Sequence, residues 1–249
     1  MHRIPRHPLD ATTQATLEQK QTGANQKRLA GTLDVTQEWQ NARQTASLRK
    51  VLATLKAMMG AHERCMYCQD SHGTDIEHFW PKTPYPERMF QWLNLLLCCA
   101  ECGRFKGDRF PLHDGEPLLI DPTVENPWQY LDFDPVTGNV VARFEIDRND
   151  WSAKGLKTVE VLQLDRREAL AAGYRRTFLR LSALVERYLA TVPADTGEFS
   201  EGLIENDDHG LLDWCFAGAG QNLSPFVELR EQQPALWQAC LDTLEAAKT

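Results

Sequence analysis

The chain has 249 residues, a formal net charge of −8, 42% hydrophobic residues and 25% charged residues. These values are typical of a globular protein with one large domain or two modest ones, and they exclude a disordered or fibrous chain. No run of about 18 apolar residues is present, and no apolar segment follows the basic residues at the start. We therefore expect neither a membrane span nor a secretory signal, and we expect a cytoplasmic protein.

The negative charge is unevenly distributed along the sequence. Residues 1–50 carry 8 basic and 4 acidic side chains, residues 51–110 carry 7 of each, and residues 111–249 carry 12 basic and 24 acidic ones. An acidic chain argues at first sight against a nucleic-acid partner, because neutralising phosphates requires Lys and Arg. The neutral-to-basic first half leaves such a partner open, but with few phosphate contacts. We therefore expect the chain to bind nucleic acid weakly by itself and to depend on a complex.

The first third of the chain predicts helices. Residues 1–33 are rich in Gln, Thr and Ala with little apolar pattern, which indicates a flexible arm or a loosely held helix. A helical pattern begins at Asp34, an N-cap with Gln37 at the capping-box position. Apolar residues at helical spacing continue it, and Gly60 suits its end: these are Leu48, Val51, Leu52, Leu55 and Met58.

Short strands and then helices are expected further along. Residues 117–122 predict a strand, and residues 130–133 and 139–144 predict a hairpin around an Asp-Pro-Val-Thr-Gly turn. Helices are expected over 151–164 and 166–189, a polar acidic linker over 192–209, and a last helix over about 225–247. One apolar stripe on the second of these helices indicates a helix-packing core: Leu170, Tyr174, Phe178, Leu181 and Leu184.

Five of the seven cysteines fall within 38 residues, and four of them form two C-x2-C pairs with 30 residues between: Cys65 and Cys68, then Cys99 and Cys102. This spacing is typical of a structural zinc site with four thiolate ligands. A disulfide framework is disfavoured by the odd cysteine count and the absence of a signal peptide. A redox role is weaker, because no thioredoxin-like pattern surrounds either pair. Cys98 is not needed for this four-cysteine site, and we predict that it is a buried thiol.

The segment between the pairs carries the chemistry. Glu77 precedes His78, Asn94 lies ahead of the second pair, and a short basic stretch follows it. This pattern resembles an HNH nuclease, a two-strand-and-helix motif that holds one divalent metal. In such a site the histidine takes a proton from a water aimed at phosphorus, while the metal neutralises charge on the phosphate. A hard oxygen ligand such as Glu77 suits Mg²⁺ or Mn²⁺.

The resemblance can be made narrower. The segments I-E-H-F-x-P-K around His78, W-x-N-L-L-L around Asn94, K-G-D-R-F-P-L from Lys106 and E-P-L-L-I-D-P from Glu116 are similar to the PtuB-type family of HNH nucleases. That family supplies the nuclease subunits of Septu anti-phage systems and of some retron-associated defence systems. The likeness covers about residues 61–185. It implies an endonuclease that works beside an ABC-type ATPase of the SMC/Rad50 kind (PtuA type). A retron reverse transcriptase and its DNA–RNA product are further partners that the resemblance suggests.

The family's roles carry over to individual positions. The general base falls on His78, the acid at the metal on Glu77, and the residue that holds the hairpin loop and orients the histidine on Asn94. The structural zinc falls on Cys65, Cys68, Cys99 and Cys102. Phosphate contacts are expected from the basic residues near this motif: Lys82, Arg104, Lys106 and Arg109.

One position departs from the family pattern. Gly103 stands directly after the last cysteine, where HNH motifs place a His or Asn that ligates the metal. Asp108 or Asp75 could complete the shell, or waters and substrate phosphates could do so. The third alternative is impaired catalysis, in which the chain is a zinc-stabilised subunit that binds nucleic acid or a partner.

Each candidate also has a structural interpretation. His78 could be a buried histidine hydrogen-bonded within a strand, Glu77 a solvated carboxylate, and the basic residues an ordinary solvated face. A homing or restriction-type HNH enzyme is less favoured, because no sequence-reading module such as a helix-turn-helix is found.

The expected fold is α+β, with a zinc-bound ββα-metal (HNH) core surrounded by N- and C-terminal helices. Residues 1–60 are expected to be an arm and helix that bind a partner, residues 61–125 the nuclease core with its four-cysteine zinc site, and residues 126–249 a hairpin followed by a helical region. DNA is the favoured substrate, with tRNA or another RNA as the alternative.

Overall fold

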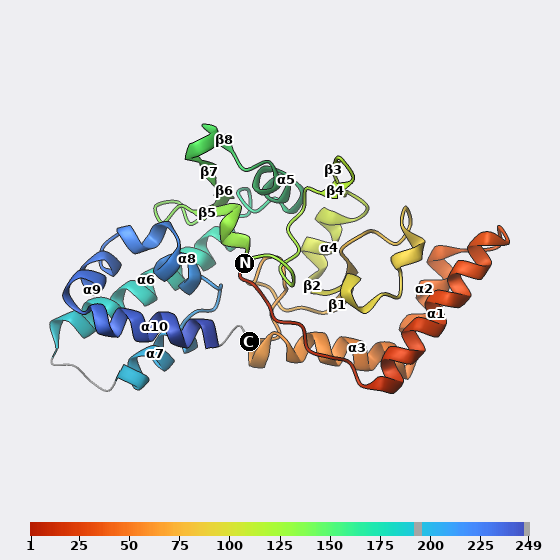
Figure 1. Cartoon of the computed structure of the whole chain (residues 1–249), viewed down its shortest axis with the longest axis horizontal. Helices are drawn as coiled ribbons and strands as arrows, with labels where there is room; N and C mark the ends of the chain where they lie inside the picture. Colours follow the sequence, from red (N-terminus) through yellow and green to blue (C-terminus); the bar gives the residue numbers. More distant parts are fainter. Residues whose placement is uncertain (192–195, 247–249) are drawn as a thin grey trace. The chain divides into compact units, whose positions relative to one another are not determined.

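The computed structural model describes residues 1–191 and 196–246. The chain forms two compact units, one built from residues 6–67 and 71–117, and the other from residues 1–5, 68–70 and the part from residue 118 onward. Over the described residues the protein is mostly helical, with four sheets of two strands each (Figure 1). The expected α+β class is confirmed.

The first unit begins with three helices, α1 (Ala11–Leu29), α2 (Val35–Arg43) and α3 (Ala46–Ala57). Asp10 caps α1 by accepting a hydrogen bond from the Thr13 amide at 2.9 Å, and Leu17 is fully buried. Of the two alternatives for residues 1–33, a helix is correct for Ala11–Leu29, and this helix is packed and not loosely held. Asp34 caps α2 as predicted, accepting from the Gln37 amide at 2.9 Å.

Two strands and a helix follow in this unit. Strand β1 (Asp75–His78) pairs antiparallel with β2 (Leu95–Cys98), and α4 (Ala100–Lys106) begins directly after β2. A short hairpin, β3 (Leu112–His113) and β4 (Glu116–Pro117), ends the unit. Single 3-10 turns lie at Gly60–His62, Pro86–Arg88 and Trp92–Asn94.

The strand predicted over 117–122 is wrong beyond Pro117. Residues 118–122 form no strand, although Leu119 and Ile120 are buried. The Ile120 amide donates to the Thr158 hydroxyl at 3.0 Å instead of to a neighbouring strand. Proline at both ends of the segment removes two further backbone donors. Apolar content alone was therefore not sufficient evidence for a strand here.

The second unit contains the predicted hairpin. Strand β5 (Leu131–Phe133) pairs with β6 (Val140–Ala142), and a second small pair joins β7 (Phe144–Glu145) to β8 (Asp150–Trp151). Helix α5 (Ala153–Leu162) packs on β6. Single 3-10 turns lie at Pro127–Gln129 and Ile146–Arg148.

The rest of the second unit is helical. It comprises α6 (Glu168–Ala190), α7 (Thr196–Glu205), α8 (Leu212–Ala217), a 3-10 turn (Ala219–Asn222), α9 (Phe226–Gln232) and α10 (Pro234–Ala246). The predicted apolar stripe on α6 is buried, apart from Leu184, which is half-buried. The predicted last helix is two helices, because Pro234 cannot continue α9. The final residue of that prediction, 247, lies outside the described residues.

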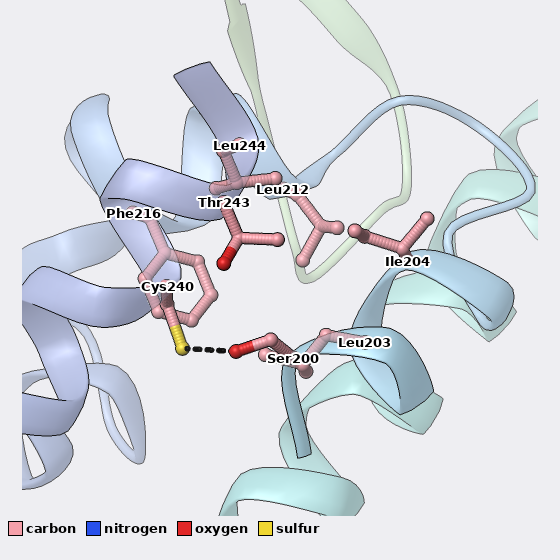
Figure 2. Close-up of a pocket in the computed structure, with 8 residues that line it drawn as sticks. All are labelled: Ser200, Leu203, Ile204, Leu212, Phe216, Cys240, Thr243 and Leu244. Atoms are coloured by element: carbon pink, nitrogen blue, oxygen red, sulfur yellow. Dashed lines mark hydrogen bonds between the residues drawn. The ribbon is translucent and has the colours of Figure 1, made fainter. Parts of the chain in front are cut away.

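The polar linker predicted over 192–209 is wrong where α7 lies, and its residues 192–195 fall outside the described part. Phe199 and Leu203, four residues apart on α7, are buried, and the surrounding acidic residues obscured this spacing. Figure 2 shows side chains of α7, α8 and α10 meeting around a small apolar pocket, where Ser200 Oγ lies 3.6 Å from Cys240 Sγ.

No helix among the described residues combines the length and the apolar character that crossing a bilayer requires.

Candidate functional site

Four cysteines form one buried group. The sulfur atoms of Cys65, Cys68, Cys99 and Cys102 all lie within 4.8 Å of one another. A tetrahedral zinc ion with Zn–S bonds of about 2.3 Å separates its sulfur ligands by about 3.8 Å. The four residues therefore fit a closed zinc site, and the predicted grouping of these cysteines is confirmed.

Local backbone geometry brings the two pairs together. Cys99 is the N-cap of α4, and its sulfur accepts from the Cys102 amide at 3.4 Å. The first pair lies in a turn where the Cys65 amide donates to the Ser71 carbonyl at 2.9 Å. The next amide, that of Met66, donates to the Leu97 carbonyl at 2.9 Å, which fixes this turn to β2.

Glu77 and His78 are neighbours on β1, opposite Leu96 and Leu95 of β2. Adjacent residues of a strand project to opposite faces, and their contacts follow this rule. The Glu77 carboxylate contacts the end of α4, whereas the His78 ring packs against Trp39 of α2.

The two oxygens of Glu77 have different surroundings. Oε1 accepts from the His78 amide at 2.8 Å and from Lys106 Nζ at 3.2 Å. Oε2 faces Gly103, where an added Cβ would lie 3.5 Å away. The missing side chain at Gly103 therefore leaves space beside Oε2.

Lys106 is the least expected member of the site. Its side chain is fully buried, and Nζ donates to the His78 carbonyl at 2.6 Å and to the Gly107 carbonyl at 3.4 Å, as well as to Glu77. Burial lowers the pKa of this lysine, and the nearby Glu77 carboxylate opposes that shift. The expectation that Lys106 contacts phosphate is therefore wrong in this structure, because its ammonium group contacts protein groups and is shielded from solvent.

The His78 ring is 2% exposed. Its Nε2 lies 3.0 Å from the Met89 carbonyl oxygen, and because a carbonyl only accepts, Nε2 carries the proton. Trp39 packs edge-on at 4.3 Å between ring centroids. Burial lowers the pKa of His78 to about 3, and the charges of Lys82 and Lys106 act in the same direction. The ring is therefore neutral at pH 7, with its free lone pair on Nδ1.

Asn94 ties the loop between β1 and β2 together. Its side-chain oxygen accepts from the Trp80 amide at 2.7 Å, and its side-chain nitrogen donates to the Trp80 and Arg88 carbonyls at 3.0 Å each. The Asn94 carbonyl also accepts from the Phe79 amide at 2.9 Å. One buried amide thus satisfies backbone groups at both ends of the loop.

Glu77, Asp75 and Asp108 do not form one metal-binding group among the described residues. Asp75 forms an ion pair with Arg43 at 2.8 Å, and Asp108 is exposed. Within the described part of the chain, the four cysteines are the only group of three or more His, Cys, Asp or Glu residues close enough to share a metal.

The other predicted cations are accessible. Arg104 and Arg109 are exposed and Lys82 is half-buried. The Arg104 guanidinium lies 5.2 Å from the centre of the Phe105 ring.

Trp39 and Met89 were not predicted as neighbours of the site. Helical spacing places Trp39 on the buried face of α2 but does not say which strand it covers. A signal for Lys106 was available: it lies three residues after Gly103, and hence on the same face of α4.

The fold and the cysteine group define a structural class of protein. It is an α+β protein in which a buried group of four cysteines, suited to zinc, adjoins an antiparallel strand pair and a short helix. No protein-family model matches the chain. It is 30% identical over 193 residues to the Septu protein PtuB of Bacillus thuringiensis, a match that covers 69% of each chain. The chain belongs to the PtuB family.

Proposed function

We propose that the chain is a metal-dependent HNH endonuclease that hydrolyses phosphodiester bonds in nucleic acid as the effector subunit of an anti-phage defence complex. The observation that carries the proposal is the β1–β2–α4 arrangement, with Glu77 and His78 on its first strand and Cys99 and Cys102 at the start of its helix. Membership of the PtuB family supports the defence role.

His78 serves as the general base. Its hydrogen bond to the Met89 carbonyl holds the proton on Nε2 and directs the lone pair to Nδ1. At pH 7 the ring is unprotonated, so its Nδ1 lone pair is free. An efficient general base has a pKa near the operating pH, and a pKa of about 3 makes His78 a weak base in this arrangement. Asn94 fixes the loop that contains Met89 and so keeps the ring in this orientation.

A divalent ion, Mg²⁺ or Mn²⁺, fits beside Glu77 Oε2. Gly103 leaves room there, and a single hard oxygen with waters and phosphate oxygens is a common way for proteins to hold Mg²⁺. Bound there, the ion supplies charge neutralisation at the scissile phosphate. Neither Asp75 nor Asp108 needs to contribute. Lys106 keeps Glu77 in place by occupying Oε1.

The substrate is DNA in the favoured form of the proposal, and tRNA or another RNA in the alternative. Lys82, Arg104 and Arg109 contact its phosphates, while Lys106 is assigned to the interior. Three surface cations give weak binding, so the chain depends on a partner.

That partner is an SMC/Rad50-like ABC-type ATPase of the PtuA type, bound through residues 1–60. Residues 61–125 then form the nuclease core and residues 126–249 the hairpin and helical region. A retron reverse transcriptase with its DNA–RNA product is an additional partner in some systems.

A second function is favoured by a specific observation. His78 is 2% exposed and covered by Trp39, which restricts access of water to the base. Together with Gly103, this burial favours a zinc-stabilised subunit that binds nucleic acid or a partner without cutting it.

Incubating the chain and its ATPase with plasmid DNA and with tRNA separates the two functions. The nuclease cuts one of these substrates when Mg²⁺ or Mn²⁺ is added, and stops when the ion is replaced by Ca²⁺ or withheld. If the complex binds the substrates but cuts neither one under any of these conditions, the chain is a binding subunit and not a nuclease.

A further inference from the structure

A second charged site lies in the second unit, in its part after residue 118. A cavity of about 630 Å³ opens between the turn of the β5–β6 hairpin and the first turns of α6. Four arginines and two polar residues line it: Arg166, Arg167, Arg175, Arg176, Thr137 and Asn139. We call this cavity the arginine groove.

The fold builds the groove in two ways. Residues 168, 171, 172, 175 and 176 are spaced so that they share one face of α6. Gly138, between the two polar residues, has a φ of +83°, and a Cβ there would lie 3.0 Å from Arg175 Cβ. Only glycine lets the hairpin turn approach α6 so closely. The position of the turn beside the arginines is therefore fixed by the backbone.

Two of the four arginines have no partner among the described residues, whereas Arg167 is buried. Arg175 and Arg176 are exposed, and neither forms a hydrogen bond or ion pair with any residue that the structure describes. Arg166 has Asp165 at 3.8 Å, with both side chains partly in solvent. The lining contains two carboxylates, Asp165 and Glu168, against four guanidinium groups.

These arginines lie in an acidic part of the chain. Residues 151–249 hold 10 basic and 15 acidic side chains, and some of the other cations in this part pair with carboxylates. Lys157 pairs with Glu160 at 2.7 Å, and Arg180 pairs with Asp208. Arg175 and Arg176 are neighbouring cations without carboxylate partners and repel one another, and a bound anion relieves that repulsion.

We propose that the arginine groove binds the phosphate backbone of nucleic acid. Guanidinium groups match phosphate oxygens in a bidentate manner. The apolar lining is confined to Ala171 and Ala172, so the groove offers no aromatic ring for stacking a base and no large anchor for a protein partner. Contacts of this kind are independent of sequence. The choice of nucleic acid among polyanions rests on the proposed function.

The groove adds phosphate contacts to a chain whose candidate active site has few. Each contact contributes about 0.7 to 0.9 to the slope of log K against log salt concentration. Loss of two contacts at Arg175 and Arg176 should therefore lower that slope by about 1.5.

The test is fluorescence anisotropy of the full-length chain with a labelled 30-nucleotide single strand and the matching duplex, without added divalent ions. We expect R175Q/R176Q to bind the preferred DNA at least about 10-fold more weakly at 0.1 M salt, with the lower slope. The matched control is R187Q, an exposed arginine on the same helix that does not line the groove, and it should bind within about twofold of wild type.

Equal DNA affinity of R175Q/R176Q and R187Q would overturn the proposal. So would a wild-type chain that binds polyglutamate but neither the single-stranded nor the duplex DNA. The second result would assign the groove to an acidic protein segment. Cleavage assays with the ATPase keep the two proposals separate. If DNA binding depends on Arg175 and Arg176 but no cleavage is seen, the nuclease proposal alone is contradicted. If DNA is cleaved and the double variant binds it as tightly as wild type, the arginine-groove proposal alone is contradicted.

Discussion

The Lys106 ammonium lies 3.2 Å from Glu77 Oε1 and joins the last residue of α4 to the third residue of β1. The lysine side chain is fully buried and that of Glu77 is 19% exposed, so the pair is largely shielded from water. Nζ also donates to the carbonyl of His78. The same cation thus holds the carboxylate and the backbone of the two residues that we place in the active site.

Removing that cation should be costly. Lys106→Met leaves the Glu77 carboxylate and the His78 carbonyl without their donor, and we expect the free energy of unfolding to fall by about 2–4 kcal/mol in urea titrations with saturating zinc. Adding Glu77→Gln to it should recover part of that loss. The control is Lys56→Met, which removes a more exposed pair, Lys56–Glu63 at 2.6 Å, and should cost less than about 1 kcal/mol. Equal costs for the two lysines would contradict the assigned role.

Asn94 should not be replaceable by a residue of the same shape. Asn94→Asp keeps the acceptor for the Trp80 amide but loses both donated hydrogen bonds. Asn94→Asp and Asn94→Ala should each lower the free energy of unfolding by about 2 kcal/mol or more, because buried carbonyls lose their partners. Unfolding curves of the three proteins test this. An aspartate variant as stable as wild type would show that the donated bonds contribute little.

The buried histidine predicts a pH dependence of stability. The unfolded chain protonates His78 near pH 6.5, whereas the folded chain does so only near pH 3. Folded-state stability is therefore complete above pH 6.5 and falls as the pH drops from 6.5 towards 3. Between pH 7 and pH 5 this group should account for a loss of about 2 kcal/mol.

His78→Gln isolates that contribution, because glutamine keeps an N–H donor for the Met89 carbonyl and does not titrate. Unfolding free energies of both proteins at pH 7 and pH 5, with zinc saturating, should show the smaller pH dependence in the variant. Parallel behaviour of the two proteins would mean that His78 gains a proton in the folded state.

Zinc should be structural and should depend on the four grouped cysteines alone. Metal analysis should give about one zinc per chain for wild type and for Cys98→Ala, whose sulfur lies outside the group of four. Cys99→Ser should lose the metal and the folded state of β1, β2 and α4, whereas Glu77→Gln should keep both. Zinc retained by Cys99→Ser, or lost equally by Cys98→Ala, would contradict the assignment.

Local patterns predicted much of this fold. The Asp34 cap, the hairpin around residues 134–138 and the cysteine group each depend on residues close in sequence or on a spacing that geometry dictates. The helix of residues 196–205 was missed because its buried Phe199 and Leu203 lie among acidic residues. The strand expected after Pro117 failed because the Ile120 amide found a side-chain partner, which no local pattern encodes.

The sequence predicted which candidate residues lie close together, but it did not predict their surroundings. Sequence spacing placed Glu77, His78 and Asn94 near the cysteines, but burial depends on contacts distant along the chain. Trp39 covers His78 from a helix 39 residues earlier. Lys106 was expected at the surface because lysine is nearly always solvated, and its burial follows from two acceptors on β1 that only the folded strand presents together.

The most direct test of the nuclease proposal compares wild type with His78→Gln, each bound to the ATPase subunit, on plasmid DNA and tRNA with Mg²⁺ or Mn²⁺. Equal zinc content and equal circular dichroism of the two proteins establish that the fold is kept. We predict cleavage by wild type and a rate at least about 100-fold lower for the variant, as expected for loss of a general base. Equal cleavage by both proteins, or none by either, would contradict the account.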